Sequence, residues 1–273
     1  MKKTACVVLA LGVLGVSTGS LFVRLADSPA LATAAYRMTF AFLLLAPFAL
    51  ALKRRDITCL SGRELGACVL AGFFLALHFG TWISSLDHTS VANSVVLVNT
   101  IPIWIGIIGP LATRERVGRN FWLACGLCLT GAFVLCGNGF SLSFDTLMGD
   151  GLALAGAFFV ALYLMIGRNL RKRLSLLVYA TICYGSASCF LWVAALASGQ
   201  QASGFTTDTW VALACLAQSE RAAWERGGGA RVWEERLATK DELGGKRSGG
   251  SSKVVAAASN SAFWRCLAAT LRA

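Results

Sequence analysis

Charged residues are scarce in this sequence of 273 residues, because Asp, Glu, Lys and Arg together account for only 14% of it. A soluble domain normally carries about 25% charged residues. Hydrophobic residues make up 56% of the chain, which is more apolar material than one core surrounded by water can enclose. This balance predicts an integral membrane protein and excludes a soluble enzyme.

Histidine is also rare, with two residues, and the acidic residues are scattered along the chain. An active site embedded in a membrane would need His, Asp, Glu or Cys gathered near one interface. We therefore expect the chain not to be an enzyme, and a membrane-embedded lipid-modifying transferase is the alternative. The phosphate-binding pattern G-x-x-x-x-G-K-[ST] is absent. We expect no cofactor and no metal.

Neither the ten cysteines nor the net charge of +11 changes this interpretation. Most of the cysteines lie in apolar runs, where cysteine acts as a small hydrophobic residue. The C-x-x-C of Cys125 and Cys128 lies in an uncharged run without a redox context. The basic residues form no stripe on a soluble fold, so we expect no nucleic-acid partner. The expected partners are the lipid bilayer and a small organic solute, and a homodimer remains an open alternative.

Apolar runs with few charges, most of them near the roughly 18 residues that cross a bilayer, recur along the chain. A helix satisfies its own backbone hydrogen bonds in lipid. The predicted fold class is therefore an all-α integral membrane protein with a bundle of seven to eight transmembrane helices. The predicted spans are Thr4–Val23, Leu31–Leu52, Leu65–Leu86, Val91–Ala112, Phe121–Gly137, Gly149–Gly167, Leu176–Ala197 and a short last run, Thr209–Ala217.

The distribution of Lys and Arg predicts the orientation of these spans. The amino terminus and every second loop between spans together hold thirteen Lys and Arg residues, whereas the intervening loops hold only Arg24. Because basic loops stay in the cytoplasm, we expect a multi-pass protein of the plasma (inner) membrane with a cytoplasmic amino terminus.

The chain also contains a weak internal repeat. Residues 9–24 read LALGVLGVSTGSLFVR and residues 152–168 read LALAGAFFVALYLMIGR. Tyr36 and Tyr179 are separated by the same offset of 143 residues as Leu9 and Leu152. A repeat unit of five helices crosses the membrane an odd number of times. The second copy would therefore start on the opposite side and run inverted through the membrane. Inverted repeats are typical of transporters, with the substrate site at their interface.

The stretch TSVANSVVLVNTIPIWIGIIGPLATRERVGRNFWLACGLCLTGAFVL (89–135) resembles the EamA-type family of the drug/metabolite transporter superfamily. The matching features are Pro102 within the fourth span, Glu115 just after it, and the glycine pair Gly126 and Gly131. Gly19, Ser20 and Arg37 also fit the family pattern. The resemblance implies an exporter of small metabolites or drugs that works by alternating access and is built from two inverted five-helix repeats.

The carboxyl-terminal region departs from this family. Residues 219–273 hold 16 of the charged residues but only eight Leu, Ile, Val or Phe, a composition typical of disorder. A reading-frame shift near Gln218 is one explanation, and a natural soluble tail is the other. We therefore predict a complete five-helix repeat over residues 1–138, a truncated second repeat over 147–217 and a hydrophilic tail over 218–273. An inactive transporter remnant is the alternative to an active transporter.

Polar side chains within spans usually face the interior of a bundle. The candidates for lining a substrate cavity are Ser17, Ser20, Arg37, His78, Trp82, Asn93, Asn99, Thr100 and Tyr184. Hydroxyls and amides would bind a solute by hydrogen bonds, and aromatic rings would stack on it. Each residue also has a packing interpretation. His78 either couples transport to protons or makes a structural hydrogen bond. Arg37 contacts an anionic solute, reaches toward the interface or pairs with Asp27. Pro102 cannot donate to the carbonyl of Val98, so we expect it to kink the fourth span.

Overall fold

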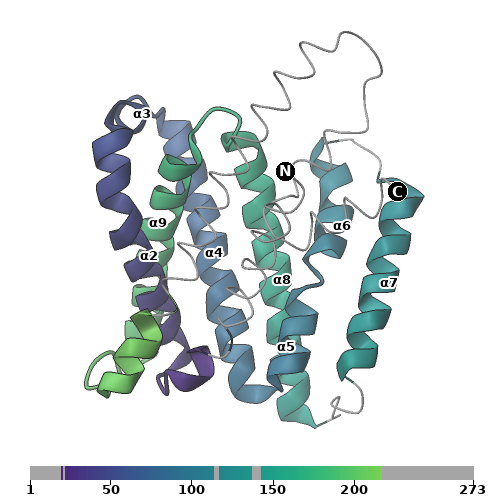
Figure 1. The fold of residues 1–273 in the computed structure, drawn as a ribbon. Coiled ribbons are helices and arrows are strands. Elements are labelled where there is room, and N and C mark those ends of the chain that lie inside the picture. The colour runs from purple at the N-terminus through teal and green to yellow at the C-terminus, as the bar shows by residue number, and fades with distance from the viewer. Residues whose placement is uncertain (1–19, 21, 114–116, 137–142, 215, 217–273) are drawn as a thin grey trace, which may run out of the picture. The chain divides into compact units, whose positions relative to one another are not determined.

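The computed structural model describes residues 20, 22–113, 117–136, 143–214 and 216, and within them all regular secondary structure is helical (Figure 1). These residues belong to one compact unit, Ser20–Ala217. The other unit, Met1–Gly19 with Gln218–Ala273, lies outside the described residues, as does nearly all of the first predicted span. The helices with defined bounds are α2 (Ala30–Leu52), α3 (Arg54–Thr58), α4 (Gly62–His88), α5 (Val91–Val98), α6 (Ile101–Thr113), α7 (Arg119–Cys136), α8 (Phe144–Leu170) and α9 (Leu176–Ala197).

Five segments of the described chain are helical, long enough and apolar enough to cross a membrane. They are α2, α4, α8, α9 and the continuous segment Val91–Pro110 that joins α5 to α6. The predicted fifth span corresponds to α7, a helix of 18 residues that is not among these five. The predicted eighth run forms a short helix over residues 207–214. The membrane character is therefore confirmed, whereas the count of seven to eight helices stays a prediction.

The fourth predicted span is divided into two helices. Helix α5 ends at Val98 and α6 begins at Ile101, with Asn99 and Thr100 in a turn between them. Pro102 is the second residue of α6. Its nitrogen carries no hydrogen, so the bond that would continue a helix from Val98 to Pro102 cannot form.

Serine residues set the starts of four helices. Each serine precedes the first helical residue, and its hydroxyl accepts a hydrogen bond from the backbone N–H three positions later, which satisfies one of the donors left free at a helix start. At α4 the bond is reciprocal, because Glu64 also accepts from the backbone N–H of Ser61. The four capping residues are Ser61, Ser90, Ser143 and Ser175.

Helix α4 is the central element and packs most extensively against α8, with further large contacts to α9 and α2. The face of α8 toward α4 carries small residues. A Cβ atom on Gly156 would lie 3.2 Å from Oγ1 of Thr81 and 3.3 Å from Cβ of Trp82. Ala153 and Ala157, on the same helix, are fully buried. Small residues let membrane helices approach until their backbones nearly touch.

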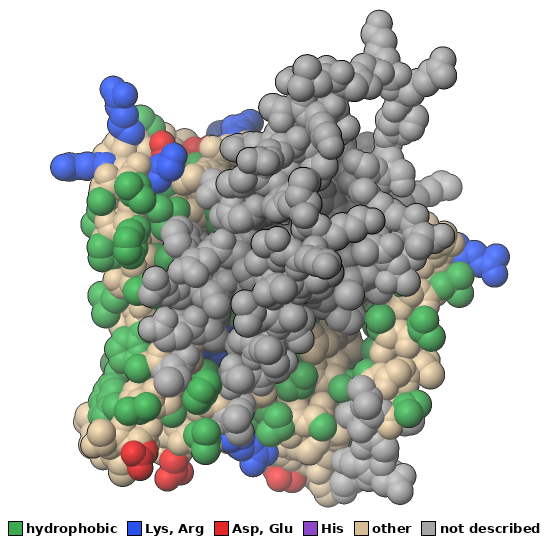
Figure 2. Space-filling model, viewed as in Figure 1, with side chains coloured by type: hydrophobic (Ala, Val, Ile, Leu, Met, Phe, Trp, Pro, Cys, Tyr) green, Lys and Arg blue, Asp and Glu red, His purple; other side chains and the backbone are tan. Residues whose placement is uncertain are grey.

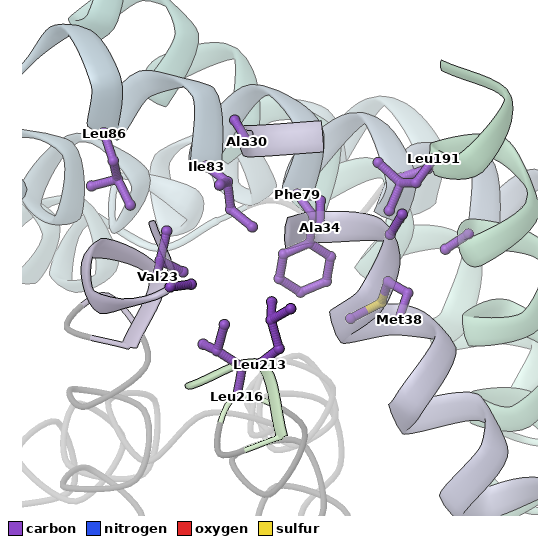
Figure 3. Packing of buried hydrophobic residues seen from close by; sticks show 14 of the residues in the cluster. Val23, Ala30, Ala34, Met38, Phe79, Ile83, Leu86, Leu191, Leu213 and Leu216 are labelled. Carbon is purple, nitrogen blue, oxygen red and sulfur yellow. The ribbon is translucent and has the colours of Figure 1, made fainter. Parts of the chain in front are cut away.

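Helices α2 and α9 lie side by side and run in opposite directions (Figure 1). They are in close contact at Gly185, where a Cβ atom would lie 3.0 Å from the ring of Phe42. One turn away, Oγ1 of Thr39 and Oγ of Ser188 are 2.7 Å apart and share a hydrogen bond. The main apolar core lies beside this crossing and joins α2, α4 and α9 to the last described residues (Figure 3). Its larger members include Met38, Phe79, Ile83, Leu86, Leu191, Leu213 and Leu216.

The two ends of the bundle differ in charge. The end formed by the carboxyl termini of α2 and α8 and the amino termini of α4 and α9 carries most of the described Lys and Arg residues. In Figure 2, blue side chains gather over α3 at this end, and red side chains lie at the opposite end. We refer to the two ends as the basic end and the acidic end.

The crossing of α4 and α9 makes a testable prediction about stability. In Gly72→Ala the new Cβ would lie 2.7 Å from the carbonyl oxygen of Cys183 and 2.7 Å from Cβ of Ser186. These atoms cannot move without separating the helices, so we expect a loss of about 1–3 kcal/mol and a lower midpoint of thermal unfolding in detergent. Gly66→Ala is the matched control on the same helix, because nothing lies within 4 Å of its Cβ position. Equal midpoints for the two variants would contradict the close crossing.

Candidate functional site

The predicted site residues within the described chain are distributed over four helices and their junctions. Arg37 lies on α2, His78 and Trp82 on α4, Asn93 on α5 and Tyr184 on α9. Asn99 and Thr100 form the turn between α5 and α6, and Ser20 is a buried helical residue near the start of the described chain. Ser17 lies outside the described residues.

Arg37 and Trp82 are brought together around a third residue, Phe79. The guanidinium carbon Cζ of Arg37 lies 4.6 Å from the ring centre of Phe79 and 5.7 Å from that of Trp82. Arg37 is only 7% exposed, so its charge is held inside the bundle against two aromatic faces. Cation–π contacts of this kind become stronger when water is excluded. We name Arg37, Phe79 and Trp82 the arginine–aromatic cluster.

His78 adjoins this cluster and also ties α4 to α8. Its Nδ1 lies 2.9 Å from the carbonyl oxygen of Gly156, and since a carbonyl can only accept, Nδ1 carries the proton and donates. The ring of His78 is parallel to that of Trp82, with centres 6.1 Å apart and planes inclined by 3°. The structural interpretation of His78 thus has a specific partner, and a proton-coupling role stays a prediction.

The indole of Trp82 has a polar atom available for a ligand. Its Nε1 is buried and has no hydrogen-bond partner among the described residues. A buried donor without a partner costs about 1–3 kcal/mol. A solute oxygen that accepts this bond would recover that cost.

The polar residues of α5 and its junction divide into two groups. Asn93 is 1% exposed and lies among the buried residues of α5. Its neighbour Ser94 is fully buried, and the Ser94 hydroxyl is 2.6 Å from that of Ser85 on α4. Asn99, in the turn after α5, instead is exposed and donates a hydrogen bond to the carbonyl of Val95 over 2.7 Å. We therefore place Asn93 nearer to the interior of the bundle than Asn99.

Thr100 and Tyr184 do not join the arginine–aromatic cluster through any described contact. The hydroxyl of Thr100 donates to the carbonyl of Leu97 over 2.7 Å. Tyr184 is half-buried and packs against the main apolar core and against a smaller one, which is formed by Cys68, Ala71, Leu170, Tyr179 and Cys183. These placements are compatible with packing roles, and cavity lining by Thr100 and Tyr184 stays a prediction.

A second aromatic group, around Tyr36, was not among the predicted site residues. Trp192 and Trp210 each meet the Tyr36 ring edge-on with centres 4.9 Å apart. The Tyr36 hydroxyl donates to the carbonyl of Ala202 over 2.6 Å. This group fixes the loop after α9 against α2 at the acidic end. The positions of Trp192 and Trp210 in the sequence do not indicate that both rings meet one tyrosine.

Polar contacts at the acidic end connect α4 to α8. Nδ1 of His88 lies 2.7 Å from Oδ1 of Asp145, and the hydroxyl of Thr89 donates to Oδ1 of Asp150 over 2.8 Å. Arg24 donates to the carbonyl of Leu86 over 2.9 Å, where the negative end of the α4 dipole favours a cation.

The groups gathered in the bundle are suited to binding. They offer a buried guanidinium, aromatic faces, an imidazole and an indole N–H, which recognise solutes by hydrogen bonds and stacking. Within the described residues there is no group of three or more His, Cys, Asp or Glu that could hold a metal ion.

Comparisons with known proteins agree with this description. Residues 3–137 match the model of the EamA-like transporter family. The "Riboflavin transporter" of Rhizobium johnstonii is 32% identical over 131 residues, which cover 46% of this chain and 41% of that protein. The "Uncharacterized transporter YxxF" of Bacillus subtilis is 25% identical over 114 residues, 41% of this chain and 37% of that protein. The chain thus matches about two fifths of the length of these curated relatives.

A solved crystal structure shares the fold. It aligns with a TM-score of 0.63 over 98% of this chain and 97% of that one, at 16% sequence identity. The family match and the transporter-named relatives point to a transporter rather than an enzyme. Residues 3–137 of this chain are an EamA family domain, the domain of a family of membrane transporters.

Proposed function

We propose that the chain exports small organic metabolites or drugs across the inner membrane by alternating access between two inverted halves. The solute site lies between the halves and includes the arginine–aromatic cluster, with Ser17, Ser20, His78, Asn93, Asn99, Thr100 and Tyr184 as further candidates. The supporting observation is the register of the crossing between α2 and α9.

The contact between α2 and α9 is compatible with the internal repeat. A two-fold axis that relates two antiparallel helices passes between equivalent residues. The ring of Phe42 lies 3.0 Å from the Cβ position of Gly185, and these two positions are separated by 143 residues. The same offset relates Tyr36 to Tyr179 in the sequence. This agreement supports the inverted arrangement that transporters use.

Riboflavin is the first solute to test, because the relative from Rhizobium johnstonii is named a riboflavin transporter. Its flat ring system could stack on Trp82, and its carbonyl oxygens could accept hydrogen bonds from Arg37 and from Nε1 of Trp82. We expect purified chain in proteoliposomes to move riboflavin down a concentration gradient faster than empty vesicles do.

Arg37→Gln is expected to reduce this flux at least about tenfold, because it removes the cation and the strongest donor of the cluster, a loss of about 1.4 kcal/mol or more. Arg37→Lys keeps the charge but loses the planar guanidinium, so an intermediate flux is expected. Leu43→Ala is the matched control on α2, since Leu43 is 57% exposed and faces away from the bundle. Unchanged flux in Arg37→Gln would remove Arg37 from the site.

The orientation of the chain can be tested with thiol labelling. Cys59 is an exposed free cysteine at the basic end, which we propose to be cytoplasmic. A membrane-impermeant maleimide should label it in inside-out vesicles and not in intact cells. Ser203→Cys, in the exposed loop after α9, should show the opposite pattern in a background where Cys59 is replaced by Ser. Labelling of both sites from the same face would refute the proposed topology.

An inactive transporter remnant is the second candidate. The observation that favours it is the composition of residues 219–273, where 16 charged residues accompany eight Leu, Ile, Val or Phe. One of the two other reading frames of the coding DNA beyond codon 218 should then encode apolar spans. A chain rebuilt from that frame would restore riboflavin flux if the present chain has none. Absence of apolar spans in both frames would eliminate the frameshift explanation.

A further inference from the structure

The basic end of the bundle carries a large surplus of positive charge. Nine described Lys and Arg residues lie there, against two acidic residues, Asp56 and Glu64. The nine are Lys53, Arg54, Arg55, Arg63, Arg119, Arg168, Arg171, Lys172 and Arg173. The acidic end holds Asp27, Asp87, Asp145, Asp150 and Asp208, with Arg24 as its basic residue.

Both acidic residues at the basic end are already engaged. Glu64 accepts hydrogen bonds through Oε2 from the backbone N–H of Ser61 over 3.0 Å and from its hydroxyl over 2.7 Å. Asp56 forms an ion pair with Lys53, with Oδ2 3.5 Å from Nζ. Two carboxylates offset only part of the positive charge of the nine basic residues.

Part of the surplus lies on α3 and at the start of α4. Arg54 and Arg55 on α3 and Arg63 on α4 are exposed. Arg173, in the connection between α8 and α9, is close enough to Glu64 to interact with its charge. Basic residues of the connection from α2 to α4 and of the connection from α8 to α9 thus lie at the same end of the bundle.

Exposed apolar side chains lie directly beside these charges. Leu50 and Leu52, in the last turn of α2, are 58% and 68% exposed, and Leu65, in the first turn of α4, is 46% exposed. The surface therefore offers cations next to exposed apolar side chains, at the ends of two helices that are long enough and apolar enough to cross a membrane. An anionic phospholipid is complementary to this surface, because its headgroup is negatively charged and its acyl chains are apolar.

The geometry points to a binding surface for anionic phospholipid, formed by Arg54, Arg55 and Arg63 together with the exposed side chains of Leu52 and Leu65. The three guanidinium groups bind the headgroup phosphate, and the leucines contact the upper acyl chain. Each basic residue near an anionic membrane surface contributes about a factor of five in affinity. This inference does not depend on the transported solute or on transport activity.

The test compares lipid binding by purified full-length chain in a neutral detergent. Native mass spectrometry would give the dissociation constants for phosphatidylglycerol and for phosphatidylcholine, and the shift in thermal unfolding midpoint would give a second readout. The neutralised variant is R54Q/R55Q/R63Q. The matched control is R54K/R55K/R63K, which retains the charges. All three side chains are exposed, so the variants should fold.

The wild type is expected to bind phosphatidylglycerol at least ten times more tightly than phosphatidylcholine, and the preference should fall as salt is raised. The glutamine variant should lose most of the preference, and the lysine variant should keep most of it. Equal affinity of the wild type for the two lipids would overturn the inference. So would an undiminished preference in the glutamine variant, which would place the lipid elsewhere.

Discussion

The close approach of α4 to α8 and α9 is the constraint on which the rest of the described bundle depends. Lipid tails are as apolar as leucine, so burial from water cannot bring membrane helices together. Contact has to come from surfaces that fit, and here the fit is made by missing side chains: Gly72 toward α9, and Gly156 with its alanine neighbours toward α4. With the backbones this close, the carbonyl of Gly156 comes within reach of His78. The position of α4 that results also determines where Trp82 and Phe79 contact Arg37.

The positions of the helices could be predicted from the sequence because hydropathy is a local property. The prediction Leu176–Ala197 coincides with α9, and Leu31–Leu52 differs from α2 by one residue. Hydropathy does not locate the polar first turns of a helix. Helix α8 begins at Phe144, five residues before the predicted Gly149. The missed signal is Ser143, a serine cap followed by Asp145 in the first turn, where an acidic residue is favourable.

The candidate site was only partly predictable, because it depends on how the helices are rotated against one another. Spacing along α4 places His78 and Trp82 on one face, and they do stack. The spacing does not show which residues of α4 face Arg37 on α2. Phe79, whose ring lies over the Arg37 guanidinium, was therefore not predicted. Asn99 and Thr100 illustrate a further limit. A continuous helix was expected to carry both, but the turn before Pro102 directs their side chains to carbonyls of α5.

The polar contacts at the acidic end have a consequence for how the helices can separate. The bonds from Thr89 to Asp150 and from His88 to Asp145 connect the carboxyl-terminal end of α4 to the first turns of α8. Separating the two helices there would exchange the contact of His88 with Asp145 for bonds to water at little cost, because both side chains are already partly hydrated. At the basic end, Cys68 of α4 instead packs with Tyr179 and Cys183 of α9 in an enclosed cluster. Separation there would expose apolar surface, so the two ends of the bundle differ in the work needed to open them.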